Sequence, residues 1–286
     1  MASAGTNARE LVAEAARAFA AAGIEEPNLE ARWLIGRVLK LSQSHLLAHP
    51  DAAVDEASAQ RYRHAVTRRA KHEPFAYIVG EREFWGDSFR VDRRVLVPRE
   101  DTEVLIRETL SVWRPASSKR EAQLIVDVGT GSGAIACVLA QEMCGARVVA
   151  CDVSAQALAV AAQNRDRLGL RERLTLVRGS LLSWLHEPAD LVVANLPYLP
   201  TARIPTLMPE VRDWEPHLAL DGGADGLDLV RLLLADARRI VRPGGTILLE
   251  LDPEQMGPAR ALFPEATHKV IADLAGLDRV LRLDLP

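Results

Sequence analysis

Four consecutive residues, Asn195, Leu196, Pro197 and Tyr198, form the segment of this chain that is best suited to bond-making chemistry. They follow an apolar run, residues 191–194, that is typical of a buried strand in a parallel sheet. Open α/β sheets bind their ligands at the carboxyl ends of such strands. The quartet offers two acceptors, the Asn195 side-chain oxygen and the Leu196 carbonyl, and a flat ring at Tyr198. It therefore predicts an enzyme that modifies a planar amide or amine.

The two acceptors address a specific difficulty of amide chemistry. An amide nitrogen is a poor nucleophile because its lone pair is delocalised into the carbonyl group. Acceptors that hold both of its N–H groups would fix the nitrogen in line with an electrophile and stabilise the positive charge that develops on it. Pro197 biases Leu196 toward extended geometry, which aims the Leu196 carbonyl outward, and Tyr198 is expected to pack on the flat group.

A glycine-rich segment, residues 127–133, ends an earlier predicted strand and leads directly into a helix. Glycines at such a bend allow positive φ and let the backbone approach a ligand, while the helix start presents free N–H groups. Asp152 closes the next predicted strand and suits a carboxylate that accepts hydrogen bonds from both hydroxyls of a ribose. These features predict an adenosine-containing ligand, bound by Asp127, Gly129, Thr130, Gly131, Ser132, Gly133, Asp152 and Asn195.

The glycine pattern leaves the identity of the ligand open. Gly129-x-Gly131-x-x-Ala134 also satisfies the dinucleotide fingerprint, so a nicotinamide-dependent dehydrogenase is an alternative. S-adenosyl-L-methionine is favoured because the chain lacks a second mononucleotide half and because a hydride-transfer enzyme has no evident need for the Asn195 quartet. For Asp127 and Asp152 the structural alternative is that they cap local turns.

Composition bounds the remaining classes. The chain has 286 residues, 48% of them hydrophobic and 26% charged, which suits a folded protein of one large or two smaller domains. A net charge of −4 argues against a nucleic-acid-binding protein whose affinity comes from broad neutralisation of phosphates. Residues 61–72 form a basic run, which is either a local basic patch or the solvated face of a helix. The three cysteines imply neither disulfides nor a metal site. Without an N-terminal apolar run, the expected location is the cytoplasm, with no membrane association.

The order of predicted elements indicates three regions. Helical patterns over 7–22, 29–41 and 55–71 predict a small all-α domain over residues 1–75, and Asn7 with Glu10 forms a capping box at its start. Short β-prone runs, the first at 77–79, predict a linking β-hairpin over 76–97. The rest, 98–286, alternates strands with helices and predicts a Rossmann-like α/β domain with a parallel sheet; its strands are expected at 124–128, 147–152, 174–177, 191–194 and 246–251, the last after a turn at 241–245.

The chain resembles, over nearly its full length, the HemK/PrmC family of peptide chain release factor N5-glutamine methyltransferases. The stretches that carry the likeness are 74–81, 84–86, 96–99 with Thr102-Glu103, 215–216 with 218–227, and 276–280. The resemblance implies a seven-stranded class I methyltransferase domain and a helical N-terminal domain that helps dock the release factor. It implies methyl transfer from S-adenosyl-L-methionine, with S-adenosyl-L-homocysteine as product, to the glutamine of a Gly-Gly-Gln motif. By the same resemblance Leu181 lines the adenine pocket, and Asn195 to Tyr198 bind the glutamine.

Four departures from the family pattern bear on this interpretation. Leu196 replaces the usual first proline of Asn-Pro-Pro-Tyr, a form also found in ribosomal RNA adenine dimethyltransferases, so a nucleic-acid adenine N6-methyltransferase is the alternative function. Ser180 stands where an acidic residue is common. Glu100-Asp101 replaces the family's Pro-Glu pair, and Leu251-Asp252 replaces its Ile-Gly pair. We expect Arg99 and Glu103 either to form a structural ion pair with each other or to contact substrate. We expect a monomer that binds no nucleic acid stably; a non-catalytic adaptor is disfavoured by the intact glycine loop, Asp152 and Asn195.

Overall fold

A computed structural model describes residues 6–113 and 123–286, and these form two compact units. One unit comprises the chain up to Glu81 together with Met208–Trp214, and the other comprises Arg82–Leu207 and Glu215–Pro286. Each unit is described by itself. None of the described helices is long and apolar enough to cross a membrane.

The first unit is helical, as predicted, and has its own apolar core. Its helices are α1 (Ala8–Ala21), α2 (Pro27–Leu39), α3 (Gln43–Ala48), α4 (Glu56–Arg69), α5 (Phe75–Val79) and the short α9 (Pro209–Arg212). The predicted capping box is confirmed: the Asn7 side chain accepts from the Glu10 N–H, and the Glu10 side chain accepts from the Asn7 N–H. Phe19, Leu34 and Tyr62 are fully buried in the core that α1, α2 and α4 share.

Residues 208–214 join this unit although they lie far along the chain. Arg69 is only 6% exposed and pairs with Glu30 at 2.7 Å and with Glu210 at 3.0 Å. The Trp214 indole donates to the Lys71 carbonyl at 3.3 Å. The expectation of a fully solvated basic face at 61–72 is therefore wrong at Arg69, which is buried and compensated by two carboxylates.

The β-prone run at 77–79 is helical in the structure, which corrects the prediction of a strand there. Pro74 stands at the N-cap of α5, and Gly80 ends the helix with φ 82°. Phe75, Ile78 and Val79 pack against the core of the helical unit. The hairpin itself begins later, with β1 (Glu81–Phe84) and β2 (Asp87–Arg90).

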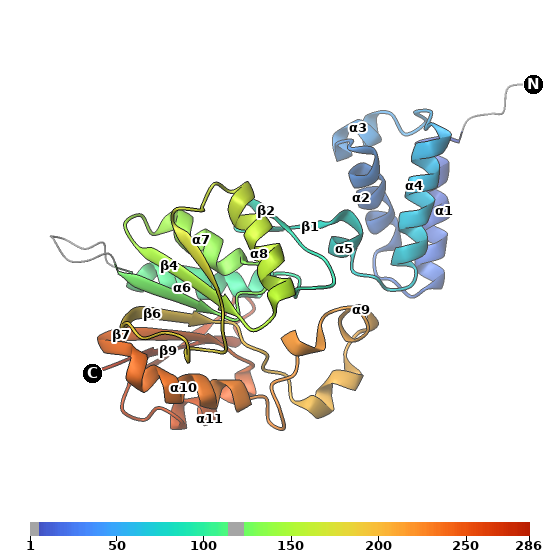
Figure 1. Ribbon diagram of the computed structural model, residues 1–286. Coiled ribbons are helices and arrows are strands. Elements are labelled where there is room, and N and C mark those ends of the chain that lie inside the picture. The colour runs from blue at the N-terminus through green and yellow to red at the C-terminus, as the bar shows by residue number, and fades with distance from the viewer. Residues whose placement is uncertain (1–5, 114–122) are drawn as a thin grey trace, which may run out of the picture. The chain divides into compact units, whose positions relative to one another are not determined.

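The second unit is built on a seven-stranded sheet, which confirms the predicted Rossmann-like methyltransferase fold (Figure 1). The sheet order is β5-β4-β3-β6-β7-β9-β8; β9 pairs antiparallel with both β7 and β8, and the other neighbouring strands pair in parallel. The strands are β3 (Leu124–Val128), β4 (Arg147–Asp152), β5 (Leu174–Arg178), β6 (Ala189–Ala194), β7 (Val241–Glu250), β8 (Thr267–Ala272) and β9 (Asp278–Asp284). Strand order reverses between β3 and β6, so their carboxyl ends form the crevice where such sheets bind ligands.

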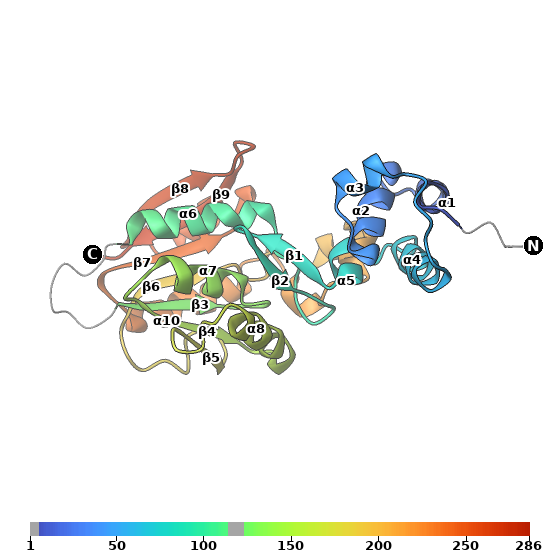
Figure 2. The same ribbon diagram turned by 90° about the horizontal axis from the view of Figure 1, so that it is seen from above.

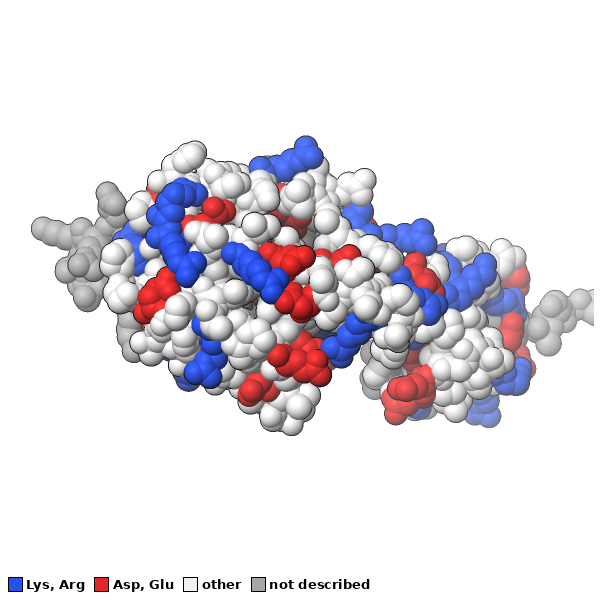
Figure 3. Space-filling view, turned by 90° about the horizontal axis from the view of Figure 1, so that it is seen from below, with Lys and Arg blue, Asp and Glu red and all other residues white. Residues whose placement is uncertain are grey.

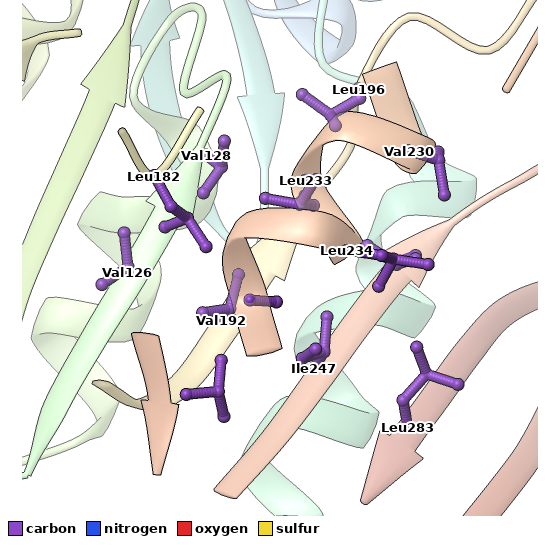
Figure 4. Close-up of a cluster of buried hydrophobic side chains, with 14 of the residues drawn as sticks. Val126, Val128, Leu182, Val192, Leu196, Val230, Leu233, Leu234, Ile247 and Leu283 are labelled. Carbon is purple, nitrogen blue, oxygen red and sulfur yellow. The ribbon is translucent and has the colours of Figure 1, made fainter. Parts of the chain in front are cut away.

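Helices cover both faces of the sheet. On one face lie α6 (Glu103–Val112), α7 (Ala134–Glu142) and α8 (Ala155–Arg167), with α6 over β7 and β9 (Figure 2). On the other lie α10 (Asp228–Ile240) and α11 (Met256–Ala261). Val230, Leu233 and Leu234 of α10 pack on the sheet beside Val192 and Ile247 (Figure 4). Four short 3₁₀ segments complete the unit: Glu100–Thr102, Thr201–Thr206, His217–Ala219 and Pro253–Gln255.

The turn predicted at 241–245 is wrong, because these residues already belong to β7. Val241 pairs with Ala189, and the register then shifts before Thr246 pairs with Leu191. Gly244, with φ 74°, lies within this irregular stretch. An irregularity of the strand rather than a chain reversal therefore explains the glycines that suggested a turn.

Candidate active site

A cavity of about 620 Å³ opens at the carboxyl edge of β3, β4 and β6, entirely within the second unit. Its volume falls in the usual range for ligand pockets. The glycine loop after β3, the end of β4, the Leu181 turn and the start of the Asn195 quartet all contribute to its wall. The structure thus brings together residues that the sequence predicted separately for cofactor and substrate.

The glycine loop owes its shape to three residues with positive φ. Gly129, Gly131 and Gly133 have φ of 76°, 55° and 80°. A Cβ on Gly133 would come within 3.0 Å of the Ala161 Cβ, so this glycine lets α7 pack closely on α8. Gly129, Thr130, Gly131 and Ser132 line the cavity, whereas Gly133 stands behind them at the N-cap of α7.

Asp127 holds the loop from beneath. It is fully buried, does not line the cavity, and its Oδ2 atom accepts a 2.6 Å hydrogen bond from the Thr130 hydroxyl. Burial raises the pKa of Asp127 to about 7, opposed by the Thr130 hydrogen bond and assisted by the nearby Asp152 charge. The geometry favours a role for Asp127 in shaping the loop rather than in touching a ligand.

Asp152 lies in the cavity wall at the end of β4. Its Oδ2 atom accepts from the Gly131 N–H at 2.9 Å, and its Oδ1 atom accepts from the Ser154 N–H at 2.8 Å. Asp152 therefore does cap local turns, which was the structural alternative for this residue. Each carboxylate oxygen retains further acceptor capacity, so the same side chain is held in place and available to donors in the cavity.

Leu181 contributes to the wall beyond β5 in a strained conformation. It has φ 48°, which is rare for a residue other than glycine, and its carbonyl accepts from the Cys151 thiol at 3.2 Å and the Trp184 indole at 2.9 Å. Gly179 allows this packing, because a Cβ there would lie 2.2 Å from the Trp184 ring. Ser180 lines the same part of the cavity.

Asn195 projects into the cavity directly after β6, and its amide is held on one side. Its Nδ2 atom donates to the Thr102 hydroxyl at 3.2 Å. In the described part of the chain no donor reaches Asn195 Oδ1. The acceptor end of the amide is therefore available to a ligand.

Leu196 connects the Asn195 quartet to the glycine loop. Its side chain is 5% exposed and joins the core beside Val230 and Leu233 (Figure 4). A Cβ on Gly129 would lie 3.0 Å from Leu196 Cδ2, so loop and quartet are in tight contact. Leucine in place of the family's proline changes the side chain and not the main-chain carbonyl, so the Leu196 carbonyl stays an acceptor.

Pro197 lines the cavity, but Tyr198 is not among the lining residues. The Tyr198 ring packs partly against the core, and burial raises its pKa to about 12. Its predicted stacking on a flat substrate group stays a prediction.

Of the two alternatives for Arg99 and Glu103, an ion pair or substrate contact, the ion pair between them is wrong. Arg99, in the cavity wall, instead pairs with the buried Glu215 at 2.7 Å, while Glu103 pairs with Arg107 at 2.9 Å. Pro216 and His217, which directly follow Glu215, also line the cavity. The Arg99–Glu215 ion pair therefore ties two parts of the cavity wall together.

Two residues near Asn195 were not assigned a role from the sequence. Thr102 is 4% exposed and lines the cavity, and Glu250 is 3% exposed at the end of β7. Burial raises the pKa of Glu250 to about 7, and hydrogen bonding to Thr102 is the largest opposing effect. The available signal was a charged residue directly after the apolar run 247–249, since Asp127 and Asp152 also lie at strand ends.

The arrangement fits an adenosine-containing ligand. Asp152 offers acceptors for ribose hydroxyls, the loop from Gly129 to Ser132 offers close backbone approach, and Leu181 offers an apolar wall. Across the same cavity, Asn195 and Leu196 offer acceptors for an NH₂ group.

Comparison with protein families assigns both parts of the chain. Residues 10–80 match the family model described as the PrmC N-terminal domain, and residues 125–214 match the model of a methyltransferase domain. A release factor glutamine methyltransferase from Moorella thermoacetica is 44% identical over 276 residues, which cover 95% of this chain and 96% of the relative. This chain belongs to the release factor glutamine methyltransferase family. Relatives of the same name from Bradyrhizobium diazoefficiens and Geobacter sulfurreducens are 41% and 40% identical, each over 91% of this chain and over 89% and 90% of their own.

Solved structures agree with the fold. The hMettl16 catalytic domain matches 81% of this chain with a TM-score of 0.56 and 14% identity, covering 83% of its own length. A methyltransferase from Pyrococcus furiosus matches 70% of this chain and 90% of its own, with a TM-score of 0.50 and 17% identity. At these identities the likeness concerns the class I methyltransferase fold alone.

The surface gives little support to the adenine alternative. In the basic run, Arg68 pairs with Glu73 at 2.6 Å, and Arg63 lies near Glu14 and Glu56 as well. Figure 3 shows basic and acidic side chains interspersed over the face that it displays. Compensated charges of this kind do not form the clustered basic surface that phosphate neutralisation requires.

Proposed function

We propose that this protein transfers one methyl group from S-adenosyl-L-methionine to N5 of the glutamine side chain in the Gly-Gly-Gln motif of peptide chain release factors, and that S-adenosyl-L-homocysteine is the product. The observation that carries this proposal is the fixed amide of Asn195. Its Nδ2 atom donates to Thr102, so its acceptor oxygen is left for a substrate donor. A primary carboxamide supplies two N–H donors, which match Asn195 Oδ1 and the Leu196 carbonyl.

The cofactor lies, in this proposal, against the loop from Gly129 to Ser132, with its ribose on Asp152 and its adenine against Leu181. Asp127 and Gly133 shape that loop from behind. When bound, S-adenosyl-L-methionine supplies an electrophilic methyl carbon on a sulfonium. The contact between Gly129 and Leu196 keeps the cofactor loop and the substrate quartet in fixed register.

The quartet acts through hydrogen bonds that strengthen during the reaction. The substrate nitrogen carries positive charge from the time of transfer until it loses a proton. Acceptors at Asn195 Oδ1 and the Leu196 carbonyl are preorganised by the end of β6, so they stabilise this charge without reorganising. Tyr198 and Pro197 are proposed to complete the glutamine site.

The helical region is proposed to dock the release factor. The proposed division is a docking domain over 1–75, a linking hairpin over 76–97 and the methyltransferase domain over 98–286, acting as a monomer. The match of residues 10–80 to the PrmC N-terminal domain supports a task for the helices in this family's reaction. A release factor truncated to the motif-bearing region should then be methylated less efficiently than the whole factor.

The test is to incubate the protein with S-adenosyl-L-methionine labelled in the methyl group and with purified release factor or ribosomal RNA. Label is expected on the motif glutamine and nowhere in RNA. A release factor with glutamate in place of the motif glutamine is the matched control and should stay unlabelled. Label in RNA only, or in the glutamate control, would reject the proposal.

A further inference from the structure

The orientation of the Asn195 amide decides whether the proposed site accepts a substrate NH₂ group. A carboxamide presents an acceptor at one end and two donors at the other, and the two ends have nearly the same shape. With Oδ1 in the cavity, Asn195 accepts from a glutamine NH₂. With Nδ2 in the cavity, donors would face donors, and the substrate nitrogen would be repelled.

Thr102 alone does not fix this orientation. Its hydroxyl accepts from Asn195 Nδ2 at 3.2 Å, but a hydroxyl can equally donate to a carboxamide oxygen after an amide flip. The Thr102 side chain is 4% exposed, so its proton must go to a neighbouring protein group. The direction of the pair therefore depends on what receives the Thr102 proton.

Glu250 is placed to receive that proton. Ala194 and Leu249 are paired in the register of β6 and β7, so Asn195 and Glu250 follow at adjacent strand ends. The Glu250 side chain is buried, interacts with both Thr102 and Asn195, and its Oε2 atom has no hydrogen-bond partner among the residues described. An ionised carboxylate accepts hydrogen bonds and donates none. The Thr102 hydroxyl must then donate to Glu250 and accept from Asn195. The direct hydrogen bonding of the Asn195 side chain to Glu250 acts in the same sense, because only its Nδ2 end can donate to a carboxylate.

We propose that Glu250 is a positioning residue that sets the direction of the hydrogen-bond chain from Asn195 through Thr102, and so turns Asn195 Oδ1 toward the substrate NH₂ group. This inference rests on the proposed function. In this inference Glu250 is a buried carboxylate that touches neither substrate nor cofactor. Through Asn195 it makes the site accept a substrate group that donates hydrogen bonds, such as NH₂, and reject one that accepts them.

Because Glu250 can take up a proton, the direction of the hydrogen-bond chain from Asn195 through Thr102 should depend on pH. Burial raises the pKa of Glu250 to about 7, and below that pH the protonated carboxyl can donate to Thr102 and permit the reverse orientation. The charged or titratable groups that face it are Arg279 from β9, Asp101 from the 3₁₀ turn before α6, and Tyr198 after β6. Burial lowers the pKa of Arg279, but interaction with Tyr198 and with acidic neighbours outweighs it and leaves that pKa raised. The pKa of Tyr198 is about 12, so both groups keep their charge state near neutrality.

The experiment compares kcat against pH for the full-length wild type and Glu250→Gln, with release factor and saturating S-adenosyl-L-methionine. The wild type should lose kcat about tenfold from the plateau to about pH 6, one unit below the pKa, because about a tenth of Glu250 is then ionised. Glu250→Gln can present either its oxygen or its NH₂ group to Thr102. At about pH 8 the kcat of this variant should be about two- to fivefold below that of the wild type, and its cofactor affinity should be unchanged. The variant should not show the acidic limb, which is the loss of kcat that the wild type shows toward pH 6.

Four further variants separate positioning from general destabilisation. Glu108→Gln removes another buried carboxylate, which pairs with Lys269 and Arg282 away from the cavity, and should keep the acidic limb. Thr102→Val should lower kcat about tenfold, whereas Thr102→Ser should restore it. Asp127→Asn removes the other carboxyl with a pKa of about 7 and should also keep the limb when cofactor saturates. An acidic limb that persists unchanged in Glu250→Gln would overturn the inference.

A second readout does not depend on the substrate. In the cofactor-bound protein the ¹⁵N side-chain signal of Asn195, assigned by its loss in Asn195→Asp, should shift with a midpoint near pH 7, and Glu250→Gln should abolish the shift. A shift that is the same in both proteins, or absent from the wild type, overturns the inference. A wild type that shows this shift but transfers no methyl group to release factor would instead reject the proposed function.

Discussion

The Gln255 side-chain amide donates a 2.7 Å hydrogen bond to the backbone carbonyl of Tyr198, and the same nitrogen donates to the Asp225 carbonyl at 3.1 Å. A turn over residues 221–226 packs against the quartet on this side. A Cβ on Gly226 would lie 2.0 Å from the Tyr198 carbonyl oxygen. The backbone that presents Asn195 and Leu196 is therefore clamped by a neighbouring turn as well as by its own strand.

Gly222→Ala should disrupt this clamp. A Cβ at Gly222 would come within 2.6 Å of the Pro197 carbonyl and 2.7 Å of the Gly226 carbonyl, and neither backbone atom can withdraw without moving the quartet. We expect a loss of about 1–3 kcal/mol in the free energy of unfolding and at least a tenfold loss of kcat. Gly257→Ala is the matched control, since a Cβ there meets nothing within 4 Å in α11, and it should stabilise by about 0.5–1 kcal/mol. Equal kcat in the two variants would contradict the clamp.

Asn195→Ala should lower methyl transfer about 100-fold or more, because it removes a positioned acceptor at the reacting nitrogen. Cofactor affinity measured by calorimetry should change little, since Asp152 and the glycine loop remain. Turnover equal to that of the wild type would reject the assigned role of Asn195.

Asp152→Asn should weaken binding of S-adenosyl-L-methionine about 10- to 100-fold, because an amide cannot accept from two ribose hydroxyls as a carboxylate does. Asp190→Asn alters a carboxylate at the opposite end of the sheet, where it accepts from the Leu124 N–H, and is the matched control. Calorimetric titration decides the point, and an unaltered Kd in Asp152→Asn would contradict the ribose assignment.

Asp127→Asn should change how stability depends on pH. The pKa of Asp127 is raised from 3.8 to about 7 in the folded protein, so folding takes up a proton between these values. Stability from this group is present below that window and is lost as pH rises toward 7, by on the order of 1–3 kcal/mol. Urea unfolding at about pH 5 and about pH 8 should show a larger drop for the wild type than for Asp127→Asn. If the free energy of unfolding changed equally with pH in the two proteins, the pKa of Asp127 would not be raised by its burial.

The sequence alone predicted the parallel half of the sheet well. β3 and β4 begin and end where the apolar runs at 124–128 and 147–152 do, because strands buried on both faces read as continuous apolar segments. β8 and β9 were not predicted from local pattern. The first of these is an edge strand with alternating partial exposure, which leaves only a weak signal.

Errors arose where tertiary packing overrode local preference. Residues 77–79 have β-branched character but form α5, because Pro74 starts the helix and its side chains complete the helical core. Arg69 was read as solvated because its partner Glu210 is distant in sequence. Thr102 and Glu250 went unassigned for the same reason: only the pairing of β6 with β7, and the packing of the turn before α6, brings them to Asn195.

The most direct measurement is a structure of the protein bound to S-adenosyl-L-homocysteine and a release factor. The motif glutamine is expected with its side-chain nitrogen about 3 Å from both Asn195 Oδ1 and the Leu196 carbonyl, facing the cofactor sulfur. A glutamine amide bound elsewhere in the cavity, or a nucleoside bound away from Asp152 and the glycine loop, would contradict the account.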